Sequence, residues 1–130
     1  MDLTWKYGAD HRPSAPVVKA TIGAFSMELL VDTGFSGGIL LPFPIFQSLG
    51  LANRLLPETY TAVLPDSRRL LAYTALSDVT IGFVRVSARV HSSPSLERRL
   101  LGREALKAMV ANLDGPKETL TLSLPSSTGQ

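Results

Sequence analysis

A single aspartate in a turn-forming sequence is the feature of this chain best suited to chemistry. Asp32 is followed by Thr33 and Gly34, directly after the apolar run 29–31. Two carboxyl groups within hydrogen-bond reach share one proton, because both cannot ionise at that distance. The ionised partner then acts as a general base on water, and the protonated partner donates to a carbonyl oxygen. Since the sequence has no internal repeat and no second aspartate in such a loop, we expect the second carboxyl to come from another copy of the chain.

The surroundings of Asp32 resemble the active-site loop of aspartic proteases. The motif ends an apolar strand that follows a hairpin, and Ser36 stands two positions after Gly34. Much later, Leu100-Leu101-Gly102 precedes a short helical stretch, which is similar to the element that packs behind the catalytic loop in retroviral-type (retropepsin-like) single-domain aspartic proteases of the bacterial or archaeal kind. The resemblance spans 17–124. It implies an all-β fold, a retropepsin-like closed barrel with one or two short helices.

The same resemblance implies a role for each residue of the loop. Asp32 would be catalytic, and the hydroxyl of Thr33 would hydrogen-bond across a dimer. Gly34 permits a tight turn and a close approach of the two loops. Phe35 departs from the small residue that is usual there, so it would narrow the space beside the carboxyl pair or turn into the core. Ser36 would bond to the loop backbone or to substrate.

Two further segments complete the predicted site. Leu100, Leu101, Gly102 and Arg103 are expected to support the loop from behind. Retroviral relatives often pair an arginine at the position of Arg103 with an acidic residue near the loop; Ser36 stands there in this chain, so that ion pair is missing or rerouted. The turn residues Leu64, Pro65, Asp66, Ser67 and Arg68 occupy the place of the family's flap, with an ordinary β-hairpin as the alternative.

Hydrophobic patterning predicts the elements that position these residues. A Gly-x pair at Gly23-Ala24 indicates a tight hairpin with a type II′ turn, and the stretch from Met109 to Leu113 fits either a helix end or a strand. Either chain end, 3–7 or 119–124, could build a dimer interface. Strands are expected at 17–22, 25–31, 39–41, 59–64, 69–81, 84–90 and 119–124, short helices near 45–49 and 103–109, one domain over 1–124 and a flexible tail over 125–130.

Composition excludes several other classes of protein. The 130 residues are 45% hydrophobic and 18% charged, which is typical of a globular domain. A net charge of +2 and scattered arginines argue against nucleic-acid binding. Without cysteine, and with His11 and His91 far apart, we expect no metal and no cofactor. No signal peptide or membrane-spanning run is recognisable, so we expect a cytoplasmic protein with no membrane partner.

The expected function is that of a homodimeric aspartic endopeptidase, acting on an extended peptide or protein substrate, with apolar pockets near Phe35, Ile39 and the hairpin. The alternative is a catalytically silent module of the same fold that serves in dimerisation or peptide binding. A third reading takes Asp32 as a structural turn residue in a monomeric barrel.

Overall fold

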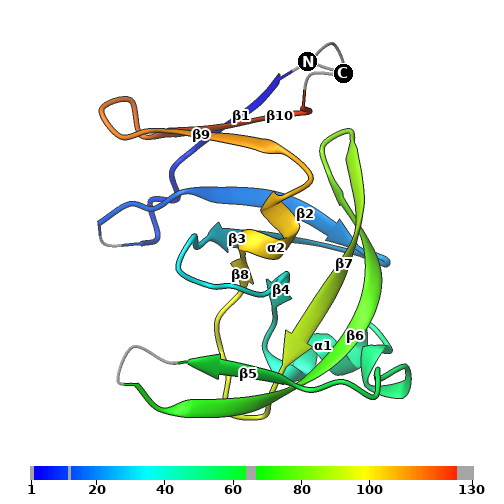
Figure 1. The fold of residues 1–130 in the computed structure, drawn as a ribbon. Helices are drawn as coiled ribbons and strands as arrows, with labels where there is room; N and C mark the ends of the chain where they lie inside the picture. Colours follow the sequence, from blue (N-terminus) through cyan, green and yellow to red (C-terminus); the bar gives the residue numbers. More distant parts are fainter. Residues whose placement is uncertain (1, 12, 64–66, 126–130) are drawn as a thin grey trace.

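The computed structural model describes residues 2–11, 13–63 and 67–125, and the chain in it is built mainly from strands (Figure 1). The helical segments are short: α1 (Phe43–Ser48), α2 (Arg103–Leu106) and the 3-10 helix η1 (Leu51–Asn53). The strands are β1 (Asp2–Lys6), β2 (Val17–Ile22), β3 (Phe25–Val31), β4 (Ile39–Leu40), β5 (Tyr60–Val63), β6 (Arg69–Ile81), β7 (Val84–Ser92), β8 (Leu100–Leu101), β9 (Val110–Asp114) and β10 (Thr119–Ser123).

Six of the strands close into a barrel. They follow the order β2-β3-β8-β4-β7-β6, and β6 pairs again with β2 through Thr21–Thr80 and Ile22–Val79. The predicted all-β closed barrel is therefore confirmed. Among the described residues, β5 pairs only with β6, and the two strands form a hairpin. β1, β10 and β9 form a separate sheet at the opposite end of the molecule (Figure 1).

Glycine sets the tight turn of the first hairpin. Ile22 pairs with Phe25 across Gly23 and Ala24, and Gly23 has a φ of +59°. A positive φ at the first loop position is the requirement of a type II′ turn, which glycine meets without steric cost. The predicted hairpin is confirmed, and it delivers β3 directly to Asp32.

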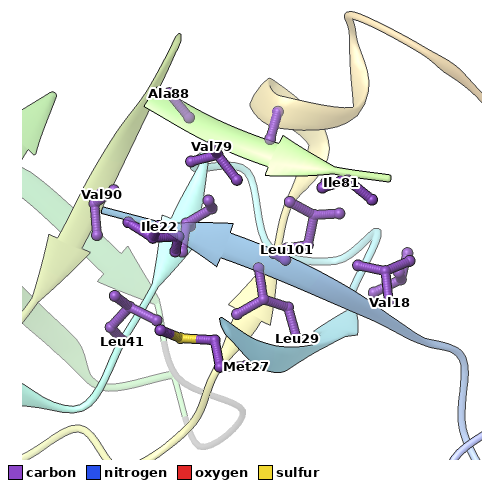
Figure 2. Close-up of a cluster of buried hydrophobic side chains, with 14 of the residues drawn as sticks. Val18, Ile22, Met27, Leu29, Leu41, Val79, Ile81, Ala88, Val90 and Leu101 are labelled. Carbon is purple, nitrogen blue, oxygen red and sulfur yellow. The ribbon is translucent and has the colours of Figure 1, made fainter. Parts of the chain in front are cut away.

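The barrel interior is filled by the alternating apolar residues of its strands (Figure 2). On β2, for example, Val18, Ala20 and Ile22 are fully buried while Lys19 and Thr21 are exposed. Burying a valine or isoleucine side chain contributes about 1.5–3 kcal/mol. The contributing side chains of β2, β3, β6, β7 and β8 meet in one cluster, which fixes the strand register and with it the loop after β3.

Helix lengths are the main departure from the sequence predictions. α2 ends at Leu106, and Val110–Asp114 is a strand, which settles the ambiguity over 109–113 in favour of β structure. The short helix near 45–49 is confirmed with a start at Phe43, whereas η1 was not predicted. Within the described residues, none of the helices has the length and apolar character needed to span a bilayer.

Candidate active site

Asp32 is held at the end of β3 by hydrogen bonds on both sides. Its backbone N–H donates to the carbonyl of Leu101 (2.9 Å), and its Oδ1 accepts the backbone N–H of Gly34 (2.9 Å). The N–H of Phe35 donates to the Asp32 carbonyl (3.1 Å) and closes the turn. A Cβ on Gly34 would lie 3.2 Å from Oδ1, so a side chain there would crowd the carboxylate. The carboxyl group is half-buried and lines an open pocket of about 520 Å³.

The segment from Leu100 to Arg103 lies behind this loop. Leu100 and Leu101 of β8 pair in parallel with Leu30 and Val31 of β3. The next three backbone N–H groups then donate to loop carbonyls, from residue 102 to 38 (2.7 Å), from 103 to 35 (2.9 Å) and from 104 to 37 (3.1 Å). The loop is therefore fixed by backbone hydrogen bonds to the start of α2.

Gly102 makes this close approach possible. A Cβ at this position would overlap the carbonyl oxygen of Gly37 and lie 2.5 Å from Cδ2 of Phe35. Its backbone has φ −104° and ψ −176°, which any residue adopts. The need for glycine at 102 is thus a matter of space alone.

Phe35 turns inward and forms a wall of the pocket. It is buried together with Leu40, Leu96 and Leu100 in a small apolar cluster beside the main core. Its ring meets that of Tyr60 edge to face, with centroids 5.8 Å apart. Of the two orientations expected for Phe35, the inward one is observed, and it leaves room beside Asp32.

Ser36 is linked to a group of residues that the sequence analysis did not single out. Its hydroxyl lies 2.6 Å from that of Tyr60 on β5, and either group can donate. The Tyr60 ring stacks on His91, with centroids 4.2 Å apart and an interplanar angle of 25°. His91 Nδ1 lies 2.9 Å from Thr74 Oγ1, and the buried Nε2 has no hydrogen-bond partner among the described residues. No sequence spacing signals this cluster, because it joins β5, β6, β7 and the loop.

The imidazole of His91 is kept neutral by its surroundings. Burial lowers the pKa of His91 to about 4, and the positive charge of Arg89 acts in the same direction, whereas Glu58 opposes it. Arg89 forms ion pairs with Glu58 (3.2 Å) and Glu104 (3.5 Å). Glu104, the acidic residue next to Arg103, is therefore paired with Arg89.

Arg103 lines the pocket, as does Arg98. Among the described residues, neither guanidinium makes a hydrogen bond or an ion pair. Thr33 is exposed, and its hydroxyl likewise has no partner in the described part of this chain.

The β5–β6 hairpin borders the pocket. Tyr60, Thr61, Ala62 and Val63 of β5 all line it. Of the predicted flap residues, Leu64, Pro65 and Asp66 lie outside the described residues, while Ser67 has a positive φ of 69° and Arg68 is described beside it. Across the described ranges, no group of three or more His, Asp or Glu side chains is placed to share a metal ion.

Comparison with known proteins adds a structural likeness. No protein-family model and no curated protein matches the sequence. Among solved structures, the chain is similar to the crystal structure of a retropepsin-like aspartic protease from Rickettsia conorii, with a TM-score of 0.69 and 23% identity over 94% of this chain and 89% of that one. It is also similar to the EIAV protease complexed with the inhibitor HBY-793, with a TM-score of 0.56 and 14% identity over 72% of this chain and 86% of that one. The geometry and these likenesses together establish that the chain has the retropepsin-like fold.

Proposed function

We propose that the chain is one subunit of a homodimeric aspartic endopeptidase. The observation that carries this proposal is the placement of Asp32. Its carboxyl is fixed by the Gly34 N–H, stands at the wall of an open pocket, and belongs to a retropepsin-like barrel.

The chemistry requires two copies of Asp32 that share one proton. The ionised carboxylate removes a proton from a water molecule, whose oxygen bonds to the carbonyl carbon of the peptide. The protonated carboxyl donates its proton to the carbonyl oxygen. Collapse of the tetrahedral intermediate breaks the C–N bond, and the proton taken from water passes to the leaving nitrogen. A hydroxyl proton of the intermediate returns to the carboxylate that had protonated the carbonyl oxygen, which restores the starting pair. Within this scheme Gly34 orients the carboxylate, and the pocket holds an apolar substrate side chain.

The second sheet supports a dimer. β10 lies between β1 and β9, so both of its edges are paired within the chain. Among the described residues, β1 and β9 each pair only with β10, so each leaves one edge of this sheet open. On β9, Ala111 and Leu113 share a sheet face with the fully buried Leu122 and Leu120 opposite them, yet both are exposed, Leu113 by 44%. We propose that a second copy pairs at the β9 edge and covers this apolar surface, since an open edge with apolar side chains favours strand addition.

The test is a digest of a mixed peptide library from pH 4 to pH 7. We expect wild-type protein to cleave and Asp32→Asn to be inactive, with Asp78→Asn as the matched control. Asp78 pairs with Arg85 on the surface, far along the sequence from the loop, so its variant should cleave normally.

Mixing subunits tests the shared pair directly. At equal amounts of wild-type and Asp32→Asn subunits, random pairing leaves about a quarter of the dimers with two intact carboxyls. Activity should then fall to about a quarter of that of the same total wild-type protein. Half of the activity would mean that each subunit works alone. A dimer that cleaves no peptide in either form would instead favour the silent dimerisation or peptide-binding module.

A further inference from the structure

The pocket beside Asp32 carries an excess of positive charge. Its ionisable lining residues are Asp32, Tyr60, Arg98 and Arg103. A guanidinium stays protonated throughout the physiological range, and a carboxyl pair that shares a proton supplies only one negative charge for two subunits. Per subunit, the pocket therefore carries two positive charges from its arginines and, on average, half a negative charge from the shared carboxyl pair.

The carboxylates nearest in sequence do not cancel this charge. Glu104 is in an ion pair with Arg89. Glu97 faces an adjoining pocket, which Arg98 also lines, but it lies beyond ion-pair distance of either guanidinium. Ser36 stands in the active-site loop without charge. The two guanidinium groups are consequently available to a ligand.

Apart from Gly34, Ser36 and Thr61, the rest of the lining is apolar. Phe35, Leu40, Leu96 and Leu100 belong to the small buried cluster. Ala62 and Val63 of β5 complete the apolar wall. An occupant of this pocket would thus place hydrocarbon against these side chains and negative charge near the arginines.

On the basis of the proposed function, we propose that the enzyme selects peptides in which the apolar side chain that enters this pocket is accompanied by an acidic side chain, held by Arg98 and Arg103. In an extended peptide, side chains two residues apart lie on the same face, separated by roughly 7 Å. The acidic residue is therefore expected two positions from the apolar one. The substrate class is an extended segment with an aspartate or glutamate near the cleaved bond.

Matched peptides test this preference. Two peptides would be compared that are identical except for one position, two residues from the apolar residue that enters the pocket. One peptide carries Glu there and the other carries Gln. Wild type should cleave the Glu peptide with a kcat/KM roughly three- to tenfold higher, as is typical of partly exposed charged hydrogen bonds. The ratio should shrink with added salt, because the charges are screened.

Substitutions then assign the preference to residues. Arg98→Gln and Arg103→Gln should each reduce the Glu/Gln ratio, and the double variant should bring it to about one. The control is Arg99→Gln, whose side chain is exposed on the same segment but does not line this pocket. With Arg103→Glu, a peptide that carries Lys at the same position should be cleaved with a higher kcat/KM than the Glu peptide. A wild-type ratio of one, or a ratio that survives the double variant, would overturn the proposal.

A binding experiment separates this proposal from the proposed function. Fluorescence anisotropy with the Asp32→Asn protein reports the affinities of the same two peptides without cleavage. Preferential binding of the Glu peptide, with no cleavage by the wild type, would keep the selectivity and reject the endopeptidase. Cleavage by the wild type with equal affinity and equal kcat/KM for both peptides would keep the endopeptidase and reject the selectivity.

Discussion

The hydroxyl groups of Tyr60 and Ser36 lie 2.6 Å apart, so the first strand of the β5–β6 hairpin is hydrogen-bonded to the loop that carries Asp32. Four consecutive residues of that strand line the pocket. The hydrogen bond therefore sets the distance between the hairpin and the loop that carries Asp32, between which substrate would lie.

Tyr60→Phe removes this hydroxyl and keeps the ring that packs on Phe35 and His91. We expect kcat/KM to fall about three- to tenfold, in line with the net worth of one hydrogen bond. The loss should appear mainly in KM, since Asp32 keeps its own backbone bonds. Steady-state kinetics measure this split. Tyr73→Phe, on the exposed side of β6, is the control; an equal loss there, or a loss confined to kcat, would argue against the role given to Tyr60.

His91 makes folding stability dependent on acid. Its pKa is about 4 in the folded chain, below the ordinary value of 6.5. Above pH 6.5 the imidazole is neutral in both states. As the pH falls from 6.5 to 4, the unfolded chain takes up the proton and the folded chain does not, so the free energy of unfolding decreases by up to about 3 kcal/mol.

Urea unfolding at pH 7 and pH 4.5 measures this decrease. His91→Asn should show a smaller difference between the two pH values than wild type, whatever its stability at pH 7. His11→Asn serves as the control, because His11 lies outside the group formed by Ser36, Tyr60, Thr74 and His91. A wild-type slope that His91→Asn leaves unchanged would assign the acid sensitivity to other groups.

Gly102→Ala tests the close packing behind the loop that carries Asp32. The added methyl group meets the Gly37 carbonyl and the Phe35 ring, and overpacking of this kind costs about 1–3 kcal/mol. Thermal unfolding should show a lowered Tm together with reduced activity. Gly115→Ala is matched to it, since a Cβ at 115 meets open space. Similar stability of the two variants would show that the loop can move away without cost.

Leu113→Lys tests the β9 edge as the dimer interface. Leu113 is 44% exposed in the single chain, so the substituted chain should keep its fold and its Tm at low concentration. A charge in an apolar interface should raise the dimer Kd at least about tenfold. Sedimentation equilibrium measures this change. Leu76→Lys is the control at equal exposure on β6; equal dimerisation of all three proteins would place the interface elsewhere.

Strand patterning gave the most accurate sequence predictions. The bounds of β6 at Arg69 and Ile81 agree with the expected 69–81, because alternation and a flanking Gly82 are local signals. β9 was ambiguous because strong helix formers precede it, and its strand conformation depends on pairing with β10. Tertiary pairing of this kind leaves no trace in a single sequence.

For the candidate site too, residues in continuous motifs could be predicted and residues brought together by strand pairing could not. The loop 32–36 and its support at 100–103 could be predicted, since both are short continuous motifs. Tyr60 and His91 could not, because they meet through the registers of separate strands. Arg98 was not among the predicted site residues, and only the fold brings it to the pocket of Asp32.

The strand β6 has different partners along its length. Its first residues, from Arg69 to Ala72, pair with β5, the residues from Tyr73 onward pair with β7, and Val79 and Thr80 also pair with β2 at the barrel seam. Amide hydrogen exchange along this one strand therefore follows two events. Near Arg69 it reports opening of the hairpin over the pocket, and near Thr80 it reports unfolding of the whole barrel.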